Sequence, residues 1–178
     1  MATLAGVFIT GCVGVTGRTD RSVAVTASSI RVEAAEPVSA RITAKPAAIT
    51  ADHTATLAVT TVWEGSARLT FETGHGVLAS PAWSSPDGTV LVHTDHRVQP
   101  ASDDGWVAER VAVPGGQEPP VSLAPGEART DEYRLWADGD HADRLGPGTY
   151  TFAHERALTV GDRSVTAGVR VELTLAEA

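Results

Sequence analysis

A strict alternation of apolar and polar residues runs through the C-terminal part of the chain and limits the folds open to it. In residues 164–175 an apolar or small side chain occupies every second position, and Arg170 and Glu172 lie between them. Successive side chains of a β-strand point to opposite faces of a sheet, so this period of two predicts a strand with one buried face. No sustained helical period occurs, and the many valines and threonines favour strands. The sequence therefore predicts an all-β protein.

The same alternation marks further short strands. They are predicted at 38–43, 57–63, 69–71, 89–93, 106–113, 130–136 and 148–153. Glu64-Gly65-Ser66 predicts a turn that joins 57–63 and 69–71 as a hairpin, and Pro86-Asp87-Gly88 predicts the turn before 89–93. About eight short strands favour an immunoglobulin-like antiparallel β-sandwich, with a small β-barrel as the alternative. The large side chains expected in its core are Trp63, Phe71, Tyr150 and Phe152.

Length and charge exclude several classes of function. The chain has 178 residues, 22 of them acidic and 14 basic, so its formal net charge is −8. This charge argues against a basic surface that binds nucleic acid. A single cysteine cannot form an internal disulfide or a cysteine-rich zinc site. We therefore expect one globular domain and no nucleic-acid partner.

The first twelve residues are typical of an exported lipoprotein. Residues 1–12 carry no charged side chain and end in Ile9-Thr10-Gly11-Cys12, which has the order of a lipobox. In a lipobox the cysteine thiol carries the lipid. The apolar run is too short to cross a bilayer as a helix and matches the middle of a signal peptide, although the basic residues that begin one are missing. The alternative is a buried strand or short helix in which Cys12 is an ordinary buried thiol.

These patterns divide the chain into three parts. Residues 1–12 are predicted to be a truncated signal peptide with a lipobox-like end, residues 13–36 a tether and first strand, and residues 37–178 the Ig-like β-sandwich domain. Cys12 is the predicted lipid-attachment residue. A lipid there would hold the protein at the extracellular face of the cell membrane, and a double-chain attachment is expected because one chain binds only marginally.

Two proline-glycine segments in the second half of the chain resemble a known family. Ser122-Leu123-Ala124-Pro125-Gly126-Glu127 precedes the strand with Tyr133 and Trp136, and Gly146-Pro147-Gly148-Thr149-Tyr150-Thr151-Phe152 follows it. This order resembles the closing half of Ig-like domains of the proteinase-inhibitor type first named from bacilli (BsuPI-like). It is also similar to the Ig-like bodies of uncharacterised secreted lipoproteins of halophilic archaea. The resemblance covers residues 37–175, departs from the family at Trp63-Glu64-Gly65, and implies a β-sandwich with an extracellular interaction role.

Two polar clusters are candidates for metal binding. His93-Thr94-Asp95-His96 places His93 and Asp95 on one strand face, and His96 joins them only if the chain bends. Asp138-Gly139-Asp140-His141-Ala142-Asp143 has the oxygen density of a calcium loop without the residue order of an EF-hand. We expect both clusters to be solvated loops of an acidic protein, so no metal ligand and no cofactor is predicted.

Catalytic motifs are not recognisable in the sequence. Ser84-Ser85 does not lie in a Gly-x-Ser-x-Gly nucleophile elbow. The adjacent carboxylates Asp103-Asp104 and Asp131-Glu132 diverge in a strand, so we expect them to be surface charges rather than an acid/base pair. The protein is therefore predicted not to be an enzyme.

Three tryptophans lie where they could contact a partner. Trp83 and Trp106 are in turn-rich segments, and Trp136 is out of phase with Leu135, so either Trp136 or Leu135 should be exposed or covered by a loop. Exposed indoles are frequent contacts for proteins or sugars. We expect instead that these rings are lids over the open ends of the core.

Together these observations predict an exported, lipid-anchored, Ig-like interaction or envelope module without catalytic activity. Its partners are the membrane, reached through the lipid anchor, and as candidates an extracellular protein or a glycan. The first alternative is a proteinase-inhibitor-like domain that presents the long, Pro- and Gly-rich segment 97–119 to a protease. The second is a metal-dependent enzyme or metal-binding protein built on His93 and His96.

Overall fold

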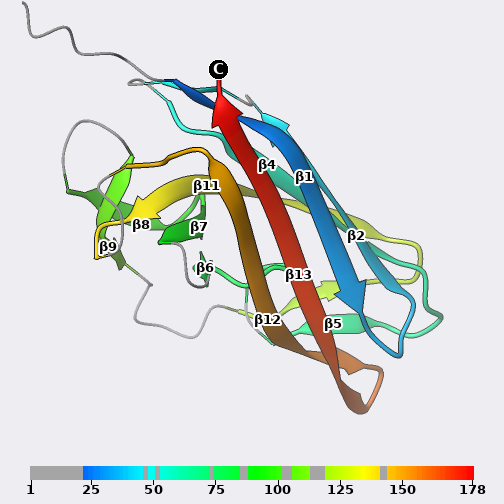
Figure 1. The fold of residues 1–178 in the computed structure, drawn as a ribbon. Coiled ribbons are helices and arrows are strands. Elements are labelled where there is room, and N and C mark those ends of the chain that lie inside the picture. The colour runs from blue at the N-terminus through cyan, green and yellow to red at the C-terminus, as the bar shows by residue number, and fades with distance from the viewer. Residues whose placement is uncertain are drawn as a thin grey trace, which may run out of the picture.

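The computed structural model describes residues 22–45, 48–50, 53–72, 74–84, 88–101, 106–112, 119–140 and 144–178. Within these residues the chain is all-β, and two sheets pack face to face as a β-sandwich (Figure 1). The predicted fold class is confirmed. The predicted lipid-attachment residue Cys12 lies outside the described residues.

The first sheet is built around one long antiparallel hairpin. Gly161, whose φ is 58°, lies in the turn between the two long strands of this hairpin. The opening strand of the domain then pairs with the last one, and the backbone N–H of Ala178 donates to the Ser22 carbonyl at 2.9 Å. In spatial order the strands are β10 (Val121–Leu123), β5 (Leu69–Phe71), β12 (Gly148–Val160), β13 (Arg163–Glu177), β1 (Val23–Glu33) and β3 (Ala48–Ile49).

The second sheet carries a small hairpin in addition to its main path. The main path is β2 (Val38–Lys45), β4 (Thr56–Trp63), β11 (Ala128–Asp138), β7 (Thr89–His93) and β6 (Ala82–Trp83). The hairpin consists of β8 (Arg97–Pro100) and β9 (Val107–Ala112), and β9 joins the sheet through a parallel pairing with β11. The predicted segment 97–119 is therefore a docked hairpin in part, and residues 102–105 and 113–118 lie outside the described residues.

The predicted hairpin between residues 57–63 and 69–71 is wrong. These residues form β4 and β5, which belong to different sheets. The reason is the fully buried Trp63. Its indole Nε1 donates to the Ala67 carbonyl at 2.6 Å, and this bond holds the segment that connects β4 to β5 against the Trp63 ring. A Cβ on Gly65 would collide with the Trp63 ring, so the glycine lets the chain pass over the indole and cross to the other sheet. Short strands such as β3 and β6 lack a readable alternation, which explains why the described chain has more than eight strands.

The main core lies between the sheets, and a smaller one lies outside them. Trp63, Phe71, Tyr150 and Phe152 are all buried between the sheets, as predicted. Trp136 packs with Val90, Val92 and Ala108 in a second cluster, whereas its neighbour Leu135 belongs to the main core. Of the two predicted outcomes, one of these residues exposed or covered by a loop, the structure shows a cover over Trp136, since Val98 of β8 and Val111 of β9 pack against this second cluster.

Candidate metal centre

Three histidines and one aspartate are buried together at one edge of the space between the sheets. His93 is the last residue of β7, His96 follows the next turn, Asp131 is in β11, and His75 is in the irregular segment 74–81. A ring nitrogen of His75, a ring nitrogen of His93 and a carboxylate oxygen of Asp131 all lie within 4.8 Å of one another. We call these four residues the histidine-aspartate cluster.

The spacing of the donor atoms is close to that of a metal site. His75 Nε2 and His96 Nε2 are 3.3 Å apart, and His93 Nε2 lies 3.7 Å from Asp131 Oδ1. Zinc–nitrogen bonds of about 2.0–2.1 Å place neighbouring corners of a tetrahedron about 3.3 Å apart. The His75 and His93 rings are stacked, with centroids 4.1 Å apart. Small movements of these side chains would therefore bring His75, His93 and Asp131 around one ion, and His96 lies beside His75 as a candidate fourth ligand.

Segment 74–81 is irregular, and side chains from both sheets hold its backbone. Tyr133 Oη donates to the Leu78 carbonyl at 2.8 Å, and Arg156 of β12 donates to the carbonyls of His75 and Gly76 at 3.1 Å. The N–H of Ala79 donates to His154 Nε2 at 3.2 Å, and burial lowers the pKa of His154, which keeps this acceptor neutral. These bonds satisfy backbone groups that no strand pairing uses, so the segment is fixed in place.

Glycine brings segment 74–81 against the aspartate. The N–H of Gly76 donates to Asp131 Oδ2 at 3.2 Å, and the N–H of Val77 donates to Thr61 Oγ1 at 3.1 Å. A Cβ on Gly76 would lie 2.8 Å from Asp131 Oδ2 and 2.8 Å from Thr61 Oγ1. Only glycine permits this approach, and it places the neighbouring His75 inside the cluster.

Asp131 is the negative charge of the cluster. Burial by itself raises the pKa of Asp131, but hydrogen bonds with His93 and Arg129 outweigh burial and hold the pKa at about 2. Arg129 Nη2 lies 2.7 Å from Asp131 Oδ1, and Arg129 Nε donates to the same oxygen at 2.8 Å. The carboxylate is therefore ionised at neutral pH, the form that can ligate a cation.

Hydrogen bonds also fix which nitrogen of two rings faces the cluster. The N–H of Asp95 donates to His93 Nδ1 at 3.2 Å, so in the neutral ring His93 Nε2 carries the hydrogen and faces Asp131. His96 Nδ1 lies 3.3 Å from Ser80 Oγ, which leaves His96 Nε2 toward His75. His93 Nε2 and His96 Nε2 are thus the ring nitrogens that face the cluster. His93 Nε2 would ligate a metal only with the ring hydrogen moved to Nδ1, which would break the hydrogen bond from the Asp95 N–H.

The structure corrects two expectations about these residues. The chain bends at residues 94–95, so His96 does join His93, and both rings are buried rather than part of a solvated loop. Asp95 stays at the surface, with its side chain 86% exposed. Asp131 is buried and is not a surface charge, although it diverges from the exposed Glu132 as predicted. Hydrogen bonding to Arg129, His93 and the Gly76 backbone is what makes this burial possible.

Sequence reasoning missed His75 and the role of Asp131. Asp131 is in phase with Tyr133 and Leu135, whose side chains face the core, and this inward position could have been recognised in the sequence. His75 lies between two glycines in a segment without periodicity, so no local signal placed it beside His93. Their contact depends on the packing of the two sheets.

The other candidate residues that the structure describes do not form a second site. Ser84 Oγ is hydrogen-bonded to Thr89 Oγ1 at 2.6 Å, which ties the turn between β6 and β7, and Ser85 and Asp103-Asp104 lie outside the described residues. In the acidic loop the N–H of Asp140 donates to Asp138 Oδ1 at 3.2 Å, an ordinary local turn. His141 and Asp143 also lie outside the described residues, so the predicted outcome for that loop stays a prediction.

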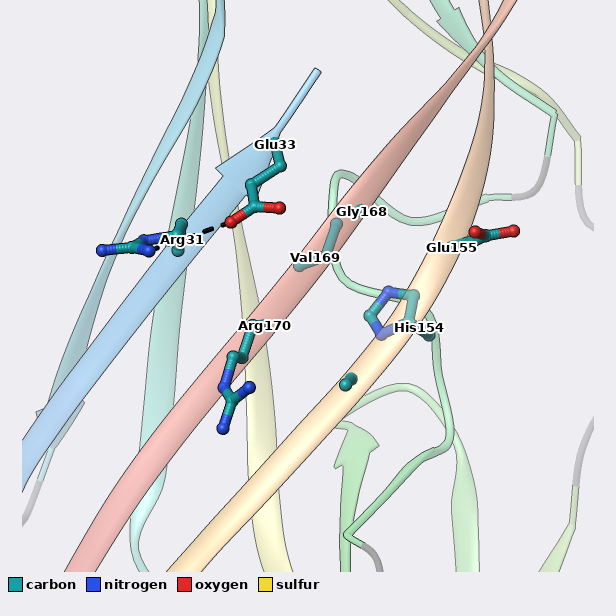
Figure 2. Close-up of a pocket in the computed structure, with 8 residues that line it drawn as sticks. Arg31, Glu33, His154, Glu155, Gly168, Val169 and Arg170 are labelled. Carbon is teal, nitrogen blue, oxygen red and sulfur yellow. Dashed lines mark ion pairs between the residues drawn. The ribbon is translucent and has the colours of Figure 1, made fainter.

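A shallow groove of about 390 Å³ lies on the first sheet, beside Arg31, Glu33 and Gly168. Figure 2 shows that the charged side chains of Arg31, Arg170 and Glu155 point in different directions. Arg31 and Glu33 form an exposed ion pair of 3.8 Å across the strand surface, a kind that contributes little. The groove therefore offers no convergent set of ligand atoms.

Comparison of the chain with protein-family models, curated proteins and solved structures finds no match. No helix capable of crossing a membrane occurs in the part of the chain that the structure describes. The histidine-aspartate cluster is consequently the feature on which a function can be argued.

Proposed function

We propose that this protein is a non-catalytic, zinc-binding β-sandwich. The observation that carries the proposal is the convergence of His75, His93 and Asp131 within 4.8 Å, with His96 Nε2 a further 3.3 Å from His75 Nε2. Imidazole nitrogens suit zinc and copper, whereas calcium and magnesium prefer sites made of oxygen. Three imidazoles and one carboxylate also match the number of ligands that zinc takes in a tetrahedral site.

The arrangement favours binding over catalysis. Catalytic zinc sites have three protein ligands and keep one position open for water or substrate, whereas closed sites with four protein ligands are structural. The cluster offers three convergent donors, His96 would be the fourth, and all four residues are buried. Zinc held here would join segment 74–81 to β7 and β11 and would stabilise the sandwich.

Isothermal titration of the full chain with zinc chloride at neutral pH tests the proposal. We expect one ion per chain, no heat with calcium or magnesium, and loss of binding in His75→Ala and His93→Ala. The matched control is His53→Ala, because His53 is exposed and lies outside the cluster, with its ring Nδ1 3.1 Å from Thr50 Oγ1. Circular dichroism confirms that each variant is folded before it is titrated.

Two results would overturn the zinc proposal. One is a wild-type chain that takes up no zinc at submillimolar concentration. The other is a His93→Ala variant that is folded and binds zinc as tightly as His53→Ala, because the ion would then lie elsewhere. Copper(II) is titrated in parallel, since tighter copper binding at the same residues would change the metal while keeping the site.

The site of action that we propose is the outer face of the cell membrane. Support comes from Cys12 directly after Ile9-Thr10-Gly11, and from the start of the sandwich at β1 only about ten residues further along the chain. A lipid on Cys12 would hold the domain there as an envelope protein that acts by binding. Radioactive palmitate labelling of the wild type and of Cys12→Ser decides this point, and equal labelling of the two chains would contradict it.

A further inference from the structure

A pocket beside Trp106 and Trp136 adjoins the histidine-aspartate cluster, because His93 and His96 line one side of it, but its other walls have a different chemistry. It has a volume of about 380 Å³, within the range of small-molecule sites. Its walls come from β8, from Trp106 directly before β9, from the end of β7 with His96, and from β11. The lining includes two indoles, two guanidiniums and apolar side chains, namely Trp106, Trp136, Arg97, Arg134, Val92 and Val98.

Positive charge gathers around this pocket in an acidic protein. Arg97 and Arg134 are both exposed, and neither guanidinium forms an ion pair or hydrogen bond with another described residue. The chain as a whole has a net charge of −8. Two guanidiniums that form no ion pair with a described carboxylate are suited to recognising an anion, because they offer paired N–H donors to a carboxylate.

Trp106 is held at the pocket in a strained backbone conformation. Its φ is 53°, in the left-handed region that bulky residues rarely adopt. Its indole Nε1 donates to the Thr50 carbonyl at 2.7 Å, and its ring meets Trp136 edge-on with centroids 5.0 Å apart. Such strain costs about 1–3 kcal/mol and concentrates at ligand sites. The half-buried ring offers a flat apolar face beside the two arginines.

Trp136 lines the pocket with its ring, whereas its indole nitrogen is buried behind the pocket surface. Its Nε1 is buried and has no hydrogen-bond partner among the residues that the structure describes. The wall thus combines a flat aromatic surface and two cations.

We propose that this pocket binds a small anion whose carboxylate is carried on a six-membered ring. The carboxylate would bind Arg97 and Arg134, and the ring would lie against Trp106. Sugar rings and aromatic rings share this chemistry, since both present a face that packs on indole. The inference goes beyond zinc binding, and it needs no metal.

Calorimetric titration of the full chain in EDTA with glucuronate and with benzoate tests the inference. EDTA removes zinc, so the result does not depend on a metal in the histidine-aspartate cluster, whose His93 and His96 also line the pocket. We expect millimolar or tighter binding of at least one acid and about tenfold weaker binding of its neutral counterpart, glucose or benzyl alcohol. The acid that binds more tightly shows whether the ring of the natural ligand is a sugar or an aromatic ring.

Variants locate the binding in this pocket. The double variant Arg97→Gln/Arg134→Gln should bind the acid at least about tenfold more weakly. Its matched control is Arg41→Gln/Arg170→Gln, which removes the same charge from other exposed strand positions. Trp106→Gly keeps a residue that tolerates the positive φ but removes the indole, and it should also lose binding. No binding of either acid, or equal binding by the two double variants, would overturn the inference.

Discussion

The space between the two sheets is filled in two different ways. Over most of its length it holds side chains such as Trp63, Phe71 and Phe152, which are buried in contact with other apolar groups. At the edge next to β7 it holds the histidine-aspartate cluster, where Arg129 and the backbone of segment 74–81 supply hydrogen bonds. The stability of the apolar part depends on how well side chains fill its volume. The stability of the polar part depends on hydrogen-bond partners and on charge. The two regions should therefore respond differently to truncation, pH and zinc.

Removing the aspartate should cause the largest loss of stability. Asp131→Ala leaves Arg129 and the Gly76 N–H without their carboxylate, and breaking a buried pair in this way costs about 3–5 kcal/mol. Urea unfolding measures the change in the free energy of unfolding. Glu132→Ala, at the exposed neighbouring position, should change it by less than about 0.5 kcal/mol. Equal effects at the two positions would remove the distinction between the regions.

Truncation in the apolar region should be slightly milder and should leave zinc binding intact. Leu173 is fully buried in β13, so Leu173→Ala should cost about 3 kcal/mol through lost contacts and a residual cavity. Unfolding in urea measures the cost. Zinc titration of the folded variant should match the wild type, and a clear loss of zinc affinity would mean that the two regions are coupled.

Acid should reduce the stability that the polar region contributes, because Asp131 becomes protonated, and should leave the contribution of the apolar region unchanged. The pKa of this carboxyl is about 2 in the folded chain against an ordinary value of 3.8, so its contribution is complete above about pH 5 and is lost as the pH falls through 2. The contribution amounts to about 2 kcal/mol. The stability difference between wild type and Asp131→Asn should therefore shrink over this range. The difference between wild type and Leu173→Ala should stay constant, and parallel pH profiles for both variants would contradict the assignment.

The smallest effect is expected at the β12–β13 turn, which belongs to neither region. Gly161 has a φ of 58°, so Gly161→Ala should cost about 1 kcal/mol through backbone strain alone. Gly146→Ala is the control, because a Cβ there meets nothing within 4 Å and φ is not positive. Thermal unfolding should separate the two variants, while zinc affinity stays that of the wild type in both. Equal melting temperatures would show that the turn relaxes without cost.

Local alternation predicted the faces of the strands well, because burial of a sheet repeats every second residue. It placed Ala167, Val169 and Leu173 inside, and it put Leu135 and Trp136 on opposite faces of β11. It did not predict which strands pair. The chain crosses between sheets after β4 because of how Trp63 packs, and that depends on residues distant in sequence.

The cluster was only partly predictable for the same reason. His93 and His96 are close in sequence, and the condition for their meeting, a bend after His93, could be stated in advance. His75 and Asp131 come from other elements, and Gly76 brings them together through a close approach of backbone to carboxylate. Such a contact leaves no periodic mark on the sequence.

The hydrogen bond between Ala178 and Ser22 has a consequence for how the domain would be displayed. Both ends of the described chain emerge at one pole of the sandwich, and the turn at Gly161 marks the opposite pole (Figure 1). The ten residues from Cys12 to Ser22 reach at most about 35 Å, and the 15 residues of β13 extend about 50 Å. A lipid on Cys12 would therefore limit the far pole to about 85 Å from the bilayer surface. The domain would act within the membrane-proximal layer of the envelope, with its Gly161 turn facing outward.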